Sequence, residues 1–430
     1  MTDFEAARMN APRAGIVDGS PRIARERAVA LIDQGNALEE QGRDAEAMAR
    51  YDAAVHADPQ CARAHLNRGN IQLAGGRTEE ARSAYESAIR CDPRYAGAHF
   101  NLGNLNSRAG DLEQALHNYE SAIGIKPDFT DAYVAMANAL ESLGRTSEAV
   151  ANYERALAIN PGYAEVHFNL GVLAMSQGRY EDAVDRLRCA LGIRADYAFA
   201  HHRLGVALLK LDRNTEAADS LRAALALNDG LSDALGALGE AQFRLGDLEA
   251  SLMSHRRLLK RNPDSAPTHY ALGSVLHSLG RTGEALESFR ETVRLQPATY
   301  MAHYAIGVML LNQRPNPPLE EAAASLRRAV QISPDFVPAH RALGVVLTNL
   351  GQPDAAEVSL RRAFSIEPES DDLLYELAMI LVALGRSEEA FELIMPALNR
   401  APPERRQETL LASATTAIPT PRSRGPPLAS

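Results

Sequence analysis

The chain has 430 residues, of which 46% are hydrophobic and only 5% are aromatic, and its formal net charge is −10. This charge disfavours a nucleic-acid backbone as the main ligand, because such a ligand requires a concentrated positive surface. Three cysteines without a C-x-x-C pair disfavour a disulfide framework or a redox site, and no apolar stretch is long enough to span a bilayer. The N-terminus lacks the apolar segment of a signal peptide, so we predict a soluble, cytoplasmic protein without membrane insertion.

The predicted elements begin after a short N-terminal segment. Residues 1–19 are predicted to be disordered, and a repeat array is predicted over residues 20–404, with repeats counted from residue 28. Proline recurs in this array at steps of 34 residues or multiples of 34, apart from one step of 37 that contains an insertion near 312–318. These prolines are Pro59, Pro93, Pro127, Pro161, Pro263, Pro297, Pro334, Pro368 and Pro402.

Small residues recur with the same period. Most repeats have glycine or alanine at position 8, glycine at position 15 and alanine at position 20, as in Gly35, Gly42 and Ala47. Small residues at positions 8 and 20 let two helices approach closely, glycine at 15 can end the first helix, and proline at 32 ends the second. We therefore predict an all-α solenoid of about eleven helix-turn-helix repeats that form a right-handed superhelix. Residues 405–430, rich in Pro, Ser and Thr, are predicted to be a disordered tail.

This spacing resembles that of tetratricopeptide repeat (TPR) proteins over residues 28–404. Units such as AHFNLGNL and VHFNLGVL are similar to the repeat region of O-GlcNAc transferase, but the catalytic domain of that family is missing. The resemblance implies only the peptide-holding part of such a protein. The sequence has no P-loop, G-x-S-x-G, H-E-x-x-H or dinucleotide-binding glycine motif, so we predict that it is not an enzyme and uses no cofactor.

Histidine recurs at position 4 of seven repeats. Successive copies would lie one repeat apart, roughly 10 Å, which is too far for two of them to share one metal ion. We therefore predict no metal site, and instead expect these side chains to pack between the two helices of a repeat and to bond to the backbone. They are His65, His99, His167, His201, His269, His303 and His340.

Asparagines mark one face of the first helix in the N-terminal half of the array. In TPR folds this face lines the concave groove, and an amide offers both a donor and an acceptor to the backbone of an extended peptide. The alternative is that some of these asparagines bond within and between helices. Position 9 holds Asn36, Asn70, Asn104 and Asn138, and position 6 holds Asn67, Asn101 and Asn169.

The same face becomes apolar beyond the fifth repeat. Such a surface would suit an amphipathic helix or an apolar peptide segment, although side chains at positions 5 and 12 can instead pack against the next repeat. The residues are Val206, Leu209, Phe243, Tyr270, Tyr304, Val308, Leu311, Val345 and Tyr375.

These patterns predict a protein-protein interaction scaffold or adaptor that binds partner segments in the groove. An alternative is a non-catalytic subunit that recruits substrates for a separately encoded glycosyltransferase or other enzyme, and self-assembly into a homo-oligomer is also possible. If the asparagines bind a ligand, replacing Asn70, Asn101 and Asn104 by alanine should weaken capture of a partner and leave thermal stability nearly unchanged.

Departures from the repeat pattern, such as Ser251 at position 20, predict that the helices stack more loosely near the seventh repeat.

Overall fold

The computed structural model describes residues 21–400, with side chains up to Pro396, and contains twenty-two helices and no strand in that range. Twenty of the helices form ten packed pairs, so the all-α helical-repeat fold predicted from the sequence is confirmed. We call the first helix of a pair the A helix and the second the B helix. The predictions for residues 1–19 and 405–430 lie outside the described residues.

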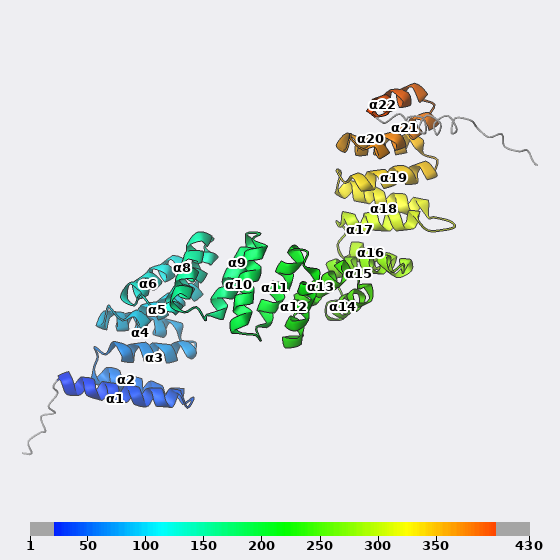
Figure 1. Ribbon diagram of the computed structural model, residues 1–430. Helices are drawn as coiled ribbons and strands as arrows, with labels where there is room; N and C mark the ends of the chain where they lie inside the picture. The colour runs from blue at the N-terminus through cyan, green and yellow to red at the C-terminus, as the bar shows by residue number, and fades with distance from the viewer. Residues whose placement is uncertain (1–20, 401–430) are drawn as a thin grey trace, which may run out of the picture. The chain divides into compact units, whose positions relative to one another are not determined.

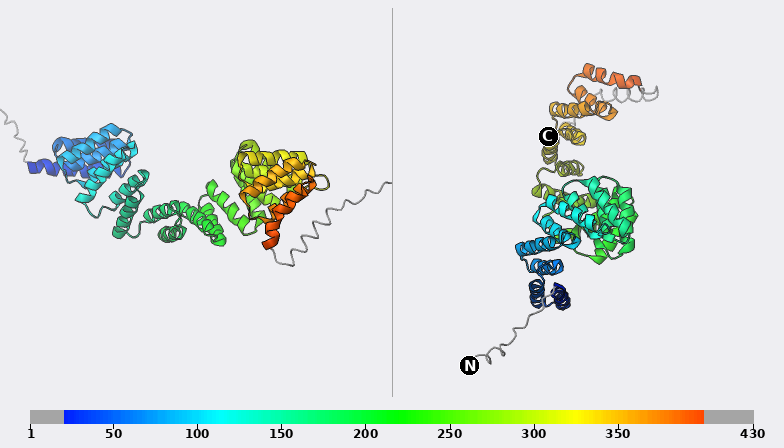
Figure 2. Two further views of the ribbon diagram at one scale, coloured as in Figure 1. Left: turned by 90° about the horizontal axis from the view of Figure 1, so that it is seen from above. Right: turned by 90° about the vertical axis from the view of Figure 1, so that its left-hand side faces the viewer.

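The chain divides into two compact units between Asp212 and Arg213. In unit 1 successive helix pairs stack side by side, as Figures 1 and 2 show. Its A helices are α1 (Pro21–Glu39), α3 (Ala62–Ala74), α5 (Ala96–Ala109), α7 (Thr130–Ser142), α9 (Ala164–Ser176) and α11 (Ala198–Lys210). Its B helices are α2 (Asp44–Ala57), α4 (Thr78–Cys91), α6 (Leu112–Ile125), α8 (Thr146–Ile159) and α10 (Tyr180–Ile193).

Unit 2 is built in the same way and begins with the B helix α12 (Asn214–Leu227). Its A helices are α13 (Ser232–Arg244), α15 (Ala266–Ser278), α17 (Tyr300–Leu311), α19 (Val337–Asn349) and α21 (Asp371–Ala383). Its further B helices are α14 (Leu248–Arg261), α16 (Thr282–Leu295), α18 (Leu319–Ile332), α20 (Pro353–Ile366) and α22 (Ser387–Arg400). Within residues 21–400 no helix combines the length and the apolar character needed to cross a bilayer.

The small residue at position 8 allows close contact between the two helices of a pair. In the third repeat, a Cβ atom added to Gly103 would lie 2.6 Å from Cε1 of Tyr119, the buried residue at position 24. The same replacement at Gly273 would place Cβ 2.9 Å from Cε1 of Phe289. The ring on the B helix therefore occupies the space that a side chain at position 8 would need.

Glycine at position 15 ends the A helix in most repeats. Gly110 follows α5 with a φ of 85°, in the left-handed region where only glycine is free of strain. In the sixth repeat this position is held by Asp212, which adopts a φ of 55°. Asp212 thus adopts the left-handed conformation that glycine takes at this position in other repeats.

The seventh repeat accommodates its departure from the pattern by a hydrogen bond. Ser251, in place of the usual alanine at position 20, is fully buried in α14, and its Oγ donates to the Gly239 carbonyl at 2.7 Å. His255 fills the position-24 site against the same glycine. Within this repeat, α13 and α14 pack against each other as the helices of other pairs do. The looser stacking of repeats expected near this position stays a prediction.

Candidate functional site: the A-helix face

The recurrent histidines bond to the backbone, as predicted. In each of the seven repeats, the Nε2 atom lies 2.9–3.2 Å from the carbonyl oxygen six residues earlier, a proline in six of the seven. The bond ties the A helix to the loop before it. In the part of the chain that the structure describes, no three His, Cys, Asp or Glu side chains are placed to hold a metal ion together.

The asparagines of unit 1 form an internal hydrogen-bond relay. In the second repeat, Tyr85 Oη donates to Asn70 Oδ1 at 3.0 Å, and Asn101 Nδ2 of the next repeat donates to the same oxygen at 2.8 Å. Asn138 receives equivalent bonds from Tyr153 and Asn169. The relay therefore connects the two helices of a repeat and also connects neighbouring A helices.

The remaining predicted asparagines follow the same arrangement. Asn36 lies within hydrogen-bonding distance of Tyr51 and Asn67, the Tyr51 hydroxyl donates to Glu39 Oε2 at 2.8 Å, and Asn104 accepts from Tyr119. The alternative reading, that asparagines bond within and between helices, thus describes their contacts in the structure. The expectation that replacing Asn70, Asn101 and Asn104 leaves stability nearly unchanged conflicts with these contacts, because the side-chain oxygens of Asn70 and Asn104 each accept a hydrogen bond from a tyrosine hydroxyl.

A signal for the relay is present in the sequence. The four repeats with asparagine at position 9 are also those with tyrosine at position 24, as in Asn36 and Tyr51, and both residues are replaced together in the fifth repeat by Val172 and Leu187. The two positions are 15 residues apart, on different helices, so periodicity within one helix could not connect them. The joint occurrence of asparagine at position 9 and tyrosine at position 24 in the same repeats could have connected them.

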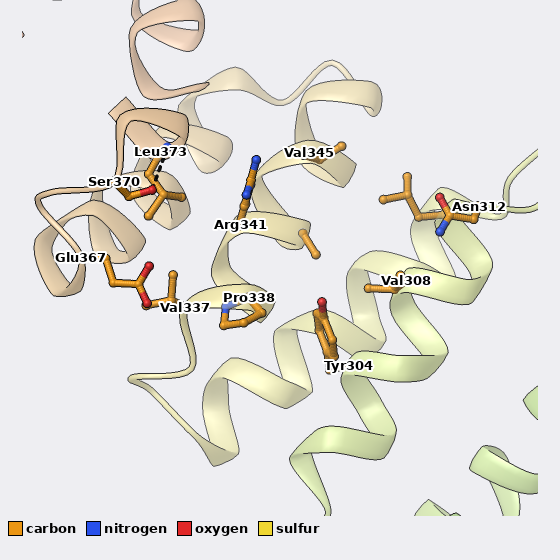
Figure 3. Close-up of a pocket in the computed structure, with 12 residues that line it drawn as sticks. Tyr304, Val308, Asn312, Val337, Pro338, Arg341, Val345, Glu367, Ser370 and Leu373 are labelled. Atoms are coloured by element: carbon orange, nitrogen blue, oxygen red, sulfur yellow. Dashed lines mark hydrogen bonds between the residues drawn. The ribbon is translucent and has the colours of Figure 1, made fainter. Parts of the chain in front are cut away.

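The A-helix face of unit 2 contains two adjoining hollows, which together we call the C-terminal groove. The first has a volume of about 370 Å³ and is lined by α17, α19 and the start of α21 (Figure 3). The second has a volume of about 300 Å³ and lies between α19 and α21. Val345, on α19 and 38% exposed, lines both.

The groove brings together five of the apolar residues predicted from positions 5, 9 and 12. Tyr304, Val308, Leu311 and Val345 line the first hollow, and Tyr375 lines the second. In Figure 3 Tyr304 and Val308 extend from α17 beside the hollow. The Tyr304 ring also packs edge-on against Phe336, with 5.2 Å between ring centroids, which fixes its position.

Two other predicted residues lie elsewhere on unit 2. Phe243 is on α13 and 37% exposed, and it lines neither hollow. Tyr270, on α15, packs against Phe289 with ring centroids 5.5 Å apart, and its hydroxyl lies 3.8 Å from Met301 Sδ. The Phe289 ring lies in the same repeat as Tyr270, and Met301 lies in the next repeat, so only the second contact matches the alternative that position 5 packs against the next repeat.

The polar residues of the groove did not follow from the repeat pattern. Arg341, at position 5 of the tenth repeat, lines the first hollow and pairs with Glu376 at 2.7 Å and with Asp372 at 3.4 Å. The hydrogen bond to Glu376 is the main cause of the raised pKa of Arg341. Glu367 borders the same hollow (Figure 3). The signal for this polar site in the sequence was the arginine at position 5 of the tenth repeat, where the ninth and eleventh repeats have tyrosine.

Comparison with protein families supports the repeat assignment. Models described as tetratricopeptide repeat or TPR repeat match residues 32–96, 84–117, 106–151 and 137–175, and again 270–335, 337–362 and 350–414. The chain is a tetratricopeptide repeat protein. A model described as the bacterial transcriptional activator domain matches residues 164–296, where this TPR protein continues the same helix pairs. No functionally curated protein matches the chain.

Several solved structures resemble parts of this TPR protein. YrrB, described as a TPR protein with an unusual peptide-binding site, is 24% identical over 44% of this chain and 95% of its own, with a TM-score of 0.39. PilF of Pseudomonas aeruginosa is 20% identical over 55% of this chain and 99% of its own, with a TM-score of 0.43. MamA of Desulfovibrio magneticus is 21% identical over 40% of this chain and 97% of its own, with a TM-score of 0.37. TPR proteins generally mediate protein-protein interactions, and their fold is typically a non-catalytic scaffold.

Proposed function

We propose that this TPR protein is a scaffold or adaptor, not an enzyme, that binds peptide segments of partner proteins on its A-helix face. The C-terminal groove is the main site in this proposal. The observation that carries it is the convergence of Tyr304, Val308 and Val345 on one hollow, next to a second hollow that is mostly apolar. Concave apolar surfaces of a few hundred Å³ with a small number of polar groups are typical binding sites.

The exposure of apolar side chains supports this role. Val345 is 38% and Met379 is 47% exposed, although both border the groove. Apolar surface that faces water in a concave region gains free energy when a partner covers it. Methionine and tyrosine suit such a site, because methionine adapts its shape and tyrosine adds a hydrogen-bonding group to a large contact area.

The asparagine relay of unit 1 offers a second, weaker site. Asn70 uses its oxygen for two internal bonds, and Asn101 uses its nitrogen for one, so the Asn70 nitrogen and the Asn101 oxygen take no part in the relay. Both side chains are only partly buried. In this proposal these groups pair with the backbone of an extended segment, while the relay holds them in place.

Photo-crosslinking in cells of the source organism tests the main site. A photoreactive amino acid replaces Val345 in the groove or, as a matched control, Val358 on the B helix α20, which is 71% exposed and lines neither hollow. We expect position 345 to crosslink to a discrete segment of one partner and position 358 not to do so. The Tyr304→Asp variant should abolish the crosslink while circular dichroism stays unchanged.

The result would contradict the proposal if both positions gave the same crosslinks, or if Tyr304→Asp left the crosslink at position 345 intact.

A subunit that recruits substrates for a separately encoded enzyme would use the same face. The identity of the crosslinked protein distinguishes that role from a scaffold. Self-association would appear as a crosslink between two copies of this chain and as a mass that rises with concentration in light scattering.

A further inference from the structure

We infer that the C-terminal groove selects a basic amphipathic segment, whose apolar side chains fill the two hollows and whose Lys or Arg residues lie beside the N-terminal half of α21. This inference rests on the proposed function and adds the chemistry of the partner. It comes from the distribution of charge around the groove.

The apolar part of the groove follows the A helices. Its residues come from three successive repeats, with Val308 on α17, Val345 on α19 and Tyr375 on α21. Because neighbouring A helices lie roughly 10 Å apart, a segment that reaches from α17 to α21 must present apolar side chains over about 20 Å. About four turns of an α-helix cover this length, with one side apolar.

Negative charge gathers at the α21 side of the groove. Glu367 lines the first hollow, Glu376 borders the second, and Asp372 lies one helical turn before Glu376. Opposite these three carboxylates is one cation, Arg341. The next arginines towards α17 in the sequence are Arg328 and Arg327 on the B helix α18 and Arg314 in the insertion after α17, and none of them lines either hollow.

The single cation does not neutralise the acidic groups. Arg341 bonds to Oε1 of Glu376, whereas Oε2 of Glu376 is buried and accepts no hydrogen bond. The Asp372 side chain is 74% exposed, and its oxygen lies 3.4 Å from Arg341. Glu367 is exposed and is not among the carboxylates that pair with Arg341. A cation on a bound segment would therefore meet the exposed carboxylates of Asp372 and Glu367, while an acidic segment would meet an arginine that is already paired.

The acidic groups around the C-terminal groove are expected to affect which segment binds more than how tightly it binds. Ion pairs between exposed groups contribute little individually, whereas repulsion of the wrong charge and steering of the right one affect the choice of partner. The apolar contacts should supply most of the binding. A basic segment and a neutral segment with the same apolar face should therefore both bind, with the basic segment tighter.

Three synthetic peptides test this inference on the full-length protein. Each is an amphipathic helix of about 15 residues with the same Leu- and Tyr-containing face, and the polar positions carry Lys, Gln or Glu. In fluorescence anisotropy at low salt we expect the Lys peptide to bind roughly 10-fold tighter than the Gln peptide, and the Glu peptide to bind most weakly. The ratio should shrink at about 0.5 M salt, because screening weakens attraction between exposed charges.

Matched variants separate the groove from the overall negative charge of the protein. Glu367→Gln with Glu376→Gln should reduce the Lys-to-Gln preference to roughly 2-fold, whereas Glu287→Gln with Glu388→Gln, exposed on two B helices, should leave it unchanged. Glu367→Gln alone guards against loss of folding in the double variant. Arg341→Met removes the competing cation and should tighten binding of the Lys peptide.

Equal binding of the Lys and Glu peptides would overturn the inference, as would an equal loss of preference in the groove and control variants. If none of the three peptides binds while position 345 still crosslinks to a partner in cells, the basic preference is wrong and the proposed scaffold function stands. If the peptides bind with the expected preference but no partner crosslinks at position 345, the proposed cellular function fails while the groove's selectivity holds.

Discussion

Tyr85 donates a hydrogen bond to Asn70, with 3.0 Å between the hydroxyl and amide oxygens, and this bond joins the two helices of the second repeat. Asn70→Ala leaves the buried Tyr85 hydroxyl without its acceptor, so we expect a loss of about 1–2 kcal/mol in the unfolding free energy. Hydrogen exchange of the α3 and α4 amides measures this loss locally. Asn152→Ala is the control, because Asn152 bonds only to the Glu148 carbonyl on its own helix. Equal effects of the two replacements would show that the relay does not stabilise the repeat.

The buried tyrosines predict a loss of stability in alkali. Burial raises the pKa of the Tyr85 and Tyr119 hydroxyls to about 12, above the usual value of about 10. Because the folded state holds these protons more strongly, each tyrosine's contribution is fully present below about pH 10 and is lost as the pH rises towards 12. The loss is roughly 1–2 kcal/mol for each tyrosine.

Urea unfolding at pH 8 and pH 11 measures this effect. The double variant Tyr85→Phe, Tyr119→Phe should lose less stability between the two pH values than the unmodified protein, whereas Tyr180→Phe, at a half-buried position at the start of α10, should behave like the unmodified protein. An unchanged pH dependence in the double variant would refute the assignment of the effect to these two hydroxyls.

The contact between Gly103 and Tyr119 predicts a strong effect of a single methyl group. In Gly103→Ala the new Cβ would lie 2.6 Å from the Tyr119 ring, so the helices must separate, at an expected cost of about 1–3 kcal/mol. Gly124→Ala, near the end of α6, places its Cβ in open space and should stabilise the helix by roughly 0.5–1 kcal/mol. Thermal unfolding of both variants tests the prediction, and a neutral Gly103→Ala would contradict the tight packing.

A buried histidine predicts sensitivity to acid in unit 2. His255 is 5% exposed, burial lowers its pKa, and its Nδ1 atom has no hydrogen-bond partner. The unfolded state therefore binds this proton more readily, so the contribution to stability is present above about pH 6.5 and is lost as the pH falls through the lowered pKa.

The His255→Phe variant copies the aromatic residue that fills the same position in the eighth repeat, Phe289. It should reduce the difference in melting temperature between pH 8 and pH 5. His277→Phe, at an exposed position of α15, should preserve that difference. If both variants showed the same pH dependence as the unmodified protein, His255 would not be the acid-sensitive group.

Much of this protein could be predicted from residues that recur every 34 positions. The prolines, the glycines at positions 8 and 15 and the alanines at position 20 act locally, since each sets a helix end or the distance between two adjacent helices. The histidine contacts were predictable for the same reason, because His99 bonds to Pro93 only six residues away. Position on a helix also sufficed to place Tyr304 and Val308 on one face, and the structure confirms that they line one hollow.

The partners of individual polar side chains were decided by the tertiary structure. Asn70 lies on the A-helix face whether it binds a peptide or Tyr85, and only the approach of α3, α4 and α5 places Tyr85 and Asn101 within hydrogen-bonding distance of its oxygen. Arg341 likewise meets Glu376 only because α19 and α21 pack side by side. The sequence by itself determined where helices begin, end and expose an apolar face, since these depend on neighbours in the chain. Hydrogen bonds and ion pairs across 15 to 35 residues depend on packing between helices, and so only the folded structure defined them.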